Sequence, residues 1–95
     1  MSHKVPIVRR PEYTIYLQEI EGTTWIHCDV TKWTANIARD LRRWADKLSE
    51  WQDGPIFALQ DPQECQKHLK FLRLMGFMEC GQISSKRGTE RIFKR

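Results

Sequence analysis

Residues 13–30 read YTIYLQEIEGTTWIHCDV, and this stretch decides the fold. Two runs rich in β-branched and aromatic residues, Tyr13–Ile20 and Thr23–Val30, flank the dipeptide Glu21-Gly22. A two-residue connection that ends in glycine favours a tight hairpin, so we predict two antiparallel strands. Because the turn fixes the register of such a hairpin, each residue of the first strand has one predicted partner in the second.

The predicted register gives the hairpin two unlike faces. One face is apolar, because Leu17 falls opposite Ile26 and Ile15 falls opposite Cys28. The other face carries aromatic and polar side chains: Tyr16, Gln18, Trp25 and His27. Such an aromatic face is typical of an interaction surface, so we predict that it binds a protein partner or a second copy of the chain, with Trp25 as the anchor.

His27 is the titratable side chain with the most interesting predicted setting, opposite Tyr16 and one same-face step from Asp29. It is a candidate general base, but a structural or surface histidine is the simpler interpretation. The sequence identifies no nucleophile beside it and no carboxylate at a known geometry. We therefore predict no catalytic residue.

Residues 33–51 follow a helical pattern. Apolar residues recur there at steps of three or four, at Trp33, Ile37, Leu41, Trp44, Leu48 and Trp51. This spacing predicts an amphipathic helix that buries the stripe, tryptophans included, and Thr31 is the expected N-cap. The opposite side alternates basic and acidic residues, as expected of a solvated helix face.

The remaining segments complete an alternating pattern. Ile56–Gln60 is a short apolar strand, expected to run parallel to the strand before the helix. A second helix is predicted over 62–75, with Asp61 as its cap and Gly76 in the left-handed conformation that ends it. Phe77–Ile83 and Thr89–Lys94 are predicted to form a closing hairpin across residues 85–88.

We therefore predict an α/β (α+β) fold with the order β-β-α-β-α-β-β, in which two helices pack on a mixed sheet. Residues 1–12 carry two prolines and no usable periodicity, so they are expected to form an extended basic arm. Residues 13–95 are expected to form a single domain.

Composition narrows the function classes. The 95 residues suffice for one modest core, and 40% of them are hydrophobic. The longest uncharged apolar run is far shorter than the ~20 residues of a membrane span, and the N-terminus lacks the apolar core of a signal peptide, so we expect an intracellular protein without a membrane partner. The three cysteines include no C-x-x-C pair, so neither a disulfide framework nor a metal site is predicted.

The net charge of +4 is unevenly distributed along the chain. Residues 1–10 carry +3 and residues 82–95 carry +4, whereas the middle carries −3. The candidate phosphate or polyanion site is the C-terminal cluster: Lys86, Arg87, Arg91, Lys94 and Arg95. One hypothesis is that the chain is a nucleic-acid accessory protein that uses these basic ends; the simpler interpretation is that they keep a small domain soluble.

The predicted second helix carries a resemblance to a known family. His68-Leu69-Lys70-Phe71-Leu72-Arg73-Leu74-Met75-Gly76-Phe77 resembles the A-x-x-F-Y-x-x-x-G-F segment of GNAT acetyltransferases, and the element order resembles the C-terminal half of that fold. The match is more similar still to the small GNAT-like internal virion proteins of short-tailed phages, which have H-x-x-F-L-x-x-x-G. The resemblance covers about residues 23–94.

The resemblance implies where coenzyme A would bind. GNAT enzymes hold its pyrophosphate with [R/Q]-x-x-G-x-[G/A], and the matching stretch is Lys32-Trp33-Thr34-Ala35-Asn36-Ile37. The candidate residues for coenzyme A binding are Thr31, Lys32, Trp33, Thr34, Ala35 and Asn36. Alanine replaces the central glycine and isoleucine the last small residue, which disfavours the close approach of a phosphate. The tyrosine that protonates the leaving thiolate in the family aligns with Leu72, which has no titratable proton.

These departures lead to three hypotheses. The first is a non-catalytic GNAT-like phage protein, without a cofactor, that acts as a virion component or a host-interaction factor in the host cytoplasm. The alternative is a minimal acetyl-CoA-dependent N-acetyltransferase in which residues 31–36 hold the cofactor and His27 or water moves the proton. The nucleic-acid accessory protein is the second alternative.

Overall fold

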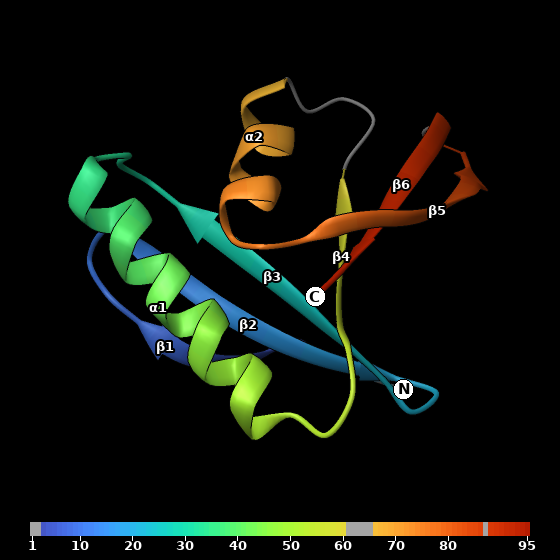
Figure 1. The fold of residues 1–95 in the computed structure, drawn as a ribbon, viewed down its shortest axis with the longest axis horizontal. Coiled ribbons are helices and arrows are strands. Elements are labelled where there is room, and N and C mark those ends of the chain that lie inside the picture. Colours follow the sequence, from blue (N-terminus) through green and yellow to red (C-terminus); the bar gives the residue numbers. More distant parts are fainter. Residues whose placement is uncertain (1–2, 61–65, 87) are drawn as a thin grey trace.

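A computed structural model describes residues 3–60, 66–86 and 88–95. Its elements are, in chain order, β1 (Val5–Arg9), β2 (Tyr13–Ile20), β3 (Thr23–Val30), α1 (Ala35–Trp51), β4 (Ile56–Gln60), α2 (Gln66–Leu74), β5 (Met78–Ser85) and β6 (Gly88–Lys94). The six strands form one mixed sheet in the order β1-β2-β3-β4-β6-β5 (Figure 1). The predicted fold class and element order are therefore confirmed, with one additional strand.

The hairpin of β2 and β3 has the register predicted from its turn. Its eight pairs run from Tyr13 opposite Val30 to Ile20 opposite Thr23. Glu21 and Gly22 adopt positive φ angles of 50° and 80°. Positive φ at both central positions is the geometry of the type I′ turn, whose twist matches that of the paired strands.

The additional strand is β1, which lies in the segment that we expected to be an extended basic arm outside the domain. The segment is extended, but residues 5–9 pair antiparallel with β2 instead of leaving the domain. Val8 faces Ile15 across this pair and is only 4% exposed. Burial of this valine stabilises the pairing of the segment with the sheet. Sequence reasoning did not predict this strand, because its five residues show no alternating pattern.

Helix α1 begins later than predicted. Its N-cap is Thr34, whose hydroxyl accepts a hydrogen bond from the Ile37 amide at 3.1 Å. The predicted cap, Thr31, instead donates its hydroxyl to the Glu12 carbonyl at 3.1 Å, and thus fastens the end of β3 to the loop before β2. Because the helix starts at Ala35, Trp33 lies outside it and does not follow its periodicity.

The buried stripe of α1 is narrower than predicted. It consists of Ile37, Leu41, Ala45 and Leu48. Trp33 and Trp51, predicted to be core residues, are 53% and 68% exposed, and Trp44 is only half-buried. Trp44 and Trp51 instead contact each other edge to face, with ring centroids 6.5 Å apart, at the border of the core.

Both helices cover the same face of the sheet. The strand-helix-strand connections through α1 and α2 both run toward β6, and right-handed crossovers then place both helices on one side. The Arg42 side chain of α1 donates to the Leu74 carbonyl at the end of α2 at 2.7 Å. The core between this layer and the sheet contains Ile15, Ile56 and Phe93, the largest fully buried side chains in the described part of the chain.

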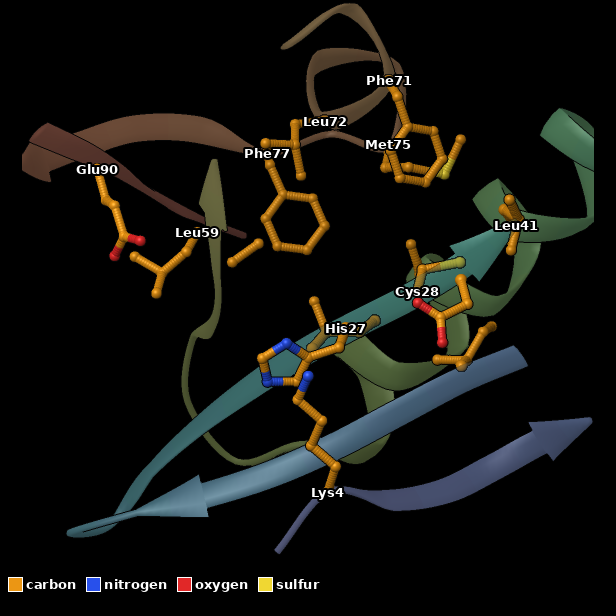
Figure 2. A pocket seen from close by; sticks show the side chains of 15 residues that line it. Lys4, His27, Cys28, Leu41, Leu59, Phe71, Leu72, Met75, Phe77 and Glu90 are labelled. Carbon is orange, nitrogen blue, oxygen red and sulfur yellow. The ribbon is translucent and has the colours of Figure 1, made fainter. Parts of the chain in front are cut away.

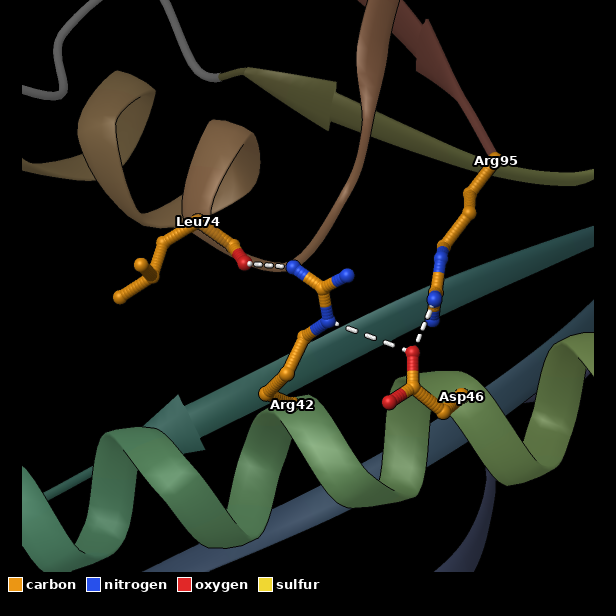
Figure 3. A network of polar contacts seen from close by, with 4 residues as sticks. All are labelled: Arg42, Asp46, Leu74 and Arg95. Atoms are coloured by element: carbon orange, nitrogen blue, oxygen red, sulfur yellow. Dashed lines mark hydrogen bonds and ion pairs between the residues drawn. The ribbon is translucent and has the colours of Figure 1, made fainter.

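A polar network ties the C-terminus to this helix layer (Figure 3). Asp46 of α1 accepts from Arg42 at 3.2 Å and from Arg95. The hydrogen bond from Arg95 is the main reason why the pKa of Asp46 lies below its ordinary value. Gly76, which ends α2 with φ of 88° as predicted, leaves room for this arginine, because a Cβ there would lie 2.9 Å from Arg95 Nε.

The closing hairpin of β5 and β6 forms as predicted, with Ser85 opposite Gly88. The predicted start of the second helix at 61–65 lies outside the described residues, as do the side chain of His68 and residue 87 of the predicted turn.

Candidate functional site

The sheet opens between β3 and β4. These parallel strands pair at only two positions, Thr24 with Ile56 and Trp25 with Phe57, and then diverge. On its other edge β3 remains paired with β2 up to Val30, and β4 remains paired with β6 up to Gln60. Beyond Trp25, the edge of β3 that faces β4 therefore has no strand partner within the described ranges, and its backbone groups border an opening in the sheet.

A cavity of about 370 Å³ occupies this opening (Figure 2). Its helix-side wall is apolar and includes Leu41 of α1, Leu72 of α2 and Met75, which directly follows α2. Its rim on the sheet side is polar, with side chains contributed by several strands and by the residue before β1: Lys4, His27, Asp29 and Glu90. The site thus combines an apolar interior with a charged entrance, as ligand sites commonly do.

His27 has a defined hydrogen bond at this rim. Its Nε2 atom lies 2.9 Å from Oε1 of Gln18 on the neighbouring strand. Since an amide oxygen only accepts, Nε2 is the protonated nitrogen in this contact. Burial lowers the pKa of His27 below 6.5, Lys4 lowers it further, and Asp29 partly opposes the shift. The ring is therefore uncharged at neutral pH.

Cys28 lines the same cavity from β3. Burial, and secondarily the charge of Asp29, raises the pKa of its thiol to about 12. The thiol stays protonated at neutral pH and is a poor nucleophile. Its role in the cavity is therefore that of an apolar wall.

The six positions predicted to hold coenzyme A connect β3 with the start of α1, and all are exposed. Two amides of the first helical turn already have partners, since Thr34 accepts from Ile37 through its hydroxyl and from Ala38 through its carbonyl. Trp33 packs edge to face on Phe71 of α2, with ring centroids 4.9 Å apart. Because Phe71 lines the cavity, this aromatic pair joins the segment to the cavity wall.

The four predicted interface residues lie on the sheet face opposite the helices, and each is half-buried. Gln18 and His27 bind each other, and Trp25 contacts Phe57 of β4 with ring centroids 5.4 Å apart. Cross-strand pairing continues this face through Lys94 to Met78, which is 74% exposed. We call the apolar strip formed by Trp25, Phe57 and Met78 the open-face strip.

The predicted polyanion cluster does not form one patch. Arg95 is engaged by Asp46, and Arg91 lies 3.8 Å from Glu79. Alternation along β6 places Arg91 and Lys94 on opposite faces of the sheet. Arg87 lies outside the described residues, and Lys86 is exposed in the turn.

Several cavity residues were not singled out from the sequence. Lys4, Glu90 and Leu59 come from three separate segments that meet only because the sheet opens. The one available signal is the unequal length of the two apolar runs, since eight residues of β3 face five of β4. That difference indicates incomplete pairing but not where pairing stops.

The described residues contain no group of three metal-ligating side chains. No helix in the described part of the chain is long and apolar enough to cross a membrane.

Three solved structures have similar folds. A ribosomal-protein-S5-alanine acetyltransferase from Vibrio fischeri matches with a TM-score of 0.71 and 14% identity, covering 88% of this chain and 53% of its own. A protein assigned as an acetyltransferase from Sphaerobacter thermophilus gives 0.59 and 15%, covering 100% and 65%. An aminoglycoside acetyltransferase in complex with coenzyme A gives 0.58 and 11%, covering 88% and 66%.

The chain spans between half and two thirds of the length of these neighbours. No protein-family profile matches the sequence, and no curated protein matches it significantly. At 11–15% identity the similarity concerns the fold alone. Over the matched part, the mixed six-stranded sheet and the two helices share the fold of these GNAT acetyltransferases.

Proposed function

We propose that this chain binds the acyl-pantetheine end of acetyl-CoA in the cavity between β3 and β4 and transfers the acetyl group to an amine. The observation that carries this proposal is the divergence of the two strands after Trp25. It leaves backbone donors and acceptors along one wall and apolar side chains along the other. An extended arm with amide groups and methylenes suits such a slot, because its amides satisfy the strand edge while its methylenes lie against Leu72 and Met75.

The rim favours an amine as the acceptor. Asp29 and Glu90 place two carboxylates at the entrance, against the single cation of Lys4. A protonated amine is attracted to such an entrance, whereas an anionic acceptor is not. The resulting substrate class is a primary amine.

The segment before α1 suggests how the affinity is distributed along the cofactor. Thr34 already engages the Ile37 amide, which would otherwise be free to face a phosphate, and Ala35 replaces the loop glycine. We therefore expect the pyrophosphate to contribute little, so that acetyl-pantetheine binds within about tenfold of acetyl-CoA.

Isothermal titration with both ligands tests the proposal. Cys28→Leu fills the cavity and is expected to weaken acetyl-CoA binding by about tenfold or more. Cys80→Leu makes the same change at an exposed position on β5 and is the matched control. Absence of binding to the wild type at millimolar ligand, or equal binding to both variants, contradicts the proposal.

The second candidate is the non-catalytic module: a phage-type GNAT-like protein, in the virion or the host cytoplasm, that associates through the open-face strip with a second copy of itself. It is supported by the exposure of Met78 and by Leu72 at the position of the family's tyrosine. The same face carries the cations Lys4 and Lys94 and the anions Asp29 and Glu90, so two copies can pair opposite charges.

Sedimentation equilibrium tests this candidate. Trp25→Ala is expected to weaken self-association by about 2 kcal/mol, whereas Trp51→Ala, which removes an exposed ring from the helix side, leaves it unchanged. A wild type that is monomeric at every concentration rules the candidate out.

A further inference from the structure

We infer that His27 carries the proton in both halves of acetyl transfer, and that Gln18 is its positioning residue; the inference rests on the proposed function. The two side chains come from neighbouring strands whose register is fixed by all eight pairs of the hairpin. Figure 2 shows His27 with Lys4 on the β2–β3 side of the cavity, across from Leu59 and Phe77. The ring thus belongs to the continuously paired β2–β3 hairpin and faces the opening between β3 and β4.

Gln18 fixes the tautomer of the imidazole. Its Oε1 lies 2.9 Å from His27 Nε2 and accepts the hydrogen there. In a neutral ring the other nitrogen, Nδ1, then carries the lone pair. A neutral imidazole with one free lone pair and one fixed N–H is the form that a general base requires.

The charged and titratable groups around the ring keep it in this form. Lys4, which precedes β1, disfavours a second positive charge beside it, and Asp29 on β3 partly offsets that effect. Tyr16 of β2 is the cross-strand partner of His27, and Glu90 of β6 lines the same cavity. The imidazole is therefore neutral before the reaction and gains a proton only from the attacking amine.

The proton balance closes on this one residue. The acceptor first releases the extra proton of its ammonium form to water, which frees the nitrogen lone pair. The neutral amine nitrogen then attacks the thioester carbonyl carbon, and the new C–N bond forms as the C–S bond breaks. One proton passes from the amine to Nδ1, and the same proton passes from the imidazolium to the departing thiolate. Leu72 lines the cavity and has no proton to give, so we assign the returning proton to the imidazolium of His27.

The experiment measures binding and transfer separately on the full chain. Acetyl-CoA binding is followed by calorimetry, and thiol release is followed with a peptide that has a free N-terminal amine. His27→Gln is expected to keep acetyl-CoA affinity within about twofold and to slow thiol release by about 10²- to 10⁴-fold. His3→Gln is the matched control, because His3 is exposed near the N-terminus and does not line the cavity.

Nitrogen NMR of labelled histidine tests the positioning role. The wild type is expected to carry its hydrogen on Nε2, and Gln18→Leu is expected to yield a mixture of tautomers and to shift the pH profile of thiol release. Gln18→Glu retains an accepting oxygen and is expected to preserve the tautomer. A hydrogen on Nδ1 in the wild type overturns the inference.

The outcomes separate the inference from the proposed function. If acetyl-CoA does not bind the wild type, the proposed function fails and the role of His27 fails with it. If acetyl-CoA binds the wild type but thiol release is absent, the transfer step of the proposed function fails together with the inference. If thiol release occurs and is unaffected by His27→Gln, only the inference fails.

Discussion

Strand β3 has two edges that behave in opposite ways. Toward β2 it forms eight consecutive pairs, whereas toward β4 it forms two and then separates. The paired edge holds Gln18, Tyr16 and His27 in a fixed register, and the unpaired edge leaves a cavity of about 370 Å³. A rigid support and an accessible site are thus built from the same eight residues.

The difference shows how a small sheet can hold a site without a separate lobe. Continuous pairing determines where each side chain lies, and incomplete pairing provides the space. Helices α1 and α2 close the helix side of that space, so the opening is accessible from the opposite face of the sheet.

The largest expected effect is a loss of stability, and it should differ between two phenylalanines on neighbouring strands, Phe93 of β6 and Phe57 of β4. Phe93 is 1% exposed on the helix side, and Phe93→Ala is expected to lower the free energy of unfolding by about 3–5 kcal/mol. Phe57 is half-buried on the other face, so Phe57→Ala is expected to cost about 1 kcal/mol. Urea denaturation measures both, and equal losses would contradict the difference between the two faces.

A smaller loss is expected at the turn that ends α2 beside the opening. Gly76→Ala forces a side chain into a positive-φ position and against Arg95, so we expect a loss of about 1–2 kcal/mol. Gly54→Ala also has positive φ but meets nothing within 4 Å. It separates the conformational cost from the contact with Arg95, and an equal loss in both variants would show that this contact has no effect.

Sequence reasoning was most successful where structure is local. The Glu21-Gly22 turn determined every pair of the hairpin, and the spacing of Ile37, Leu41 and Leu48 determined the buried face of α1. Its failures involved distant contacts. Nothing local to Trp33 indicates that α1 begins only at Ala35 and that the ring packs on Phe71.

The cavity itself was beyond sequence reasoning for the same physical reason. Its rim joins Lys4, His27 and Glu90, which are brought together by strand order. The place where β3 and β4 separate depends on how the two crossover helices pack, and no pattern within either strand encodes it.

A pH effect is expected from the paired edge. Because the pKa of His27 is lowered in the folded chain, its contribution to stability is complete above the unfolded value of 6.5 and is lost as pH falls below it. His27→Gln is expected to flatten the stability curve between pH 6.5 and 5, as measured by thermal melts. An unchanged slope would mean that the ring titrates as freely as in the unfolded chain.

The smallest expected effect concerns the cysteines. In a Cys65→Ser background, iodoacetamide is expected to modify the exposed Cys80 first. Cys28 is expected to react much more slowly, because its pKa of about 12 keeps the thiol protonated. Mass spectrometry of a time course distinguishes the sites, and comparable rates would show that the cavity wall is open to solvent.

The most direct test of the cavity as the ligand site is an amide NMR titration of the full chain with acetyl-CoA. We predict that the largest shifts occur at residues 26–30 of β3, at 58–60 of β4 and around Leu72, with little change at Glu19 and Ile20, near the turn of the paired edge. Absence of shifts at millimolar ligand, or shifts confined to the outer face of α1, would contradict the proposal that the divergence of β3 and β4 forms the site.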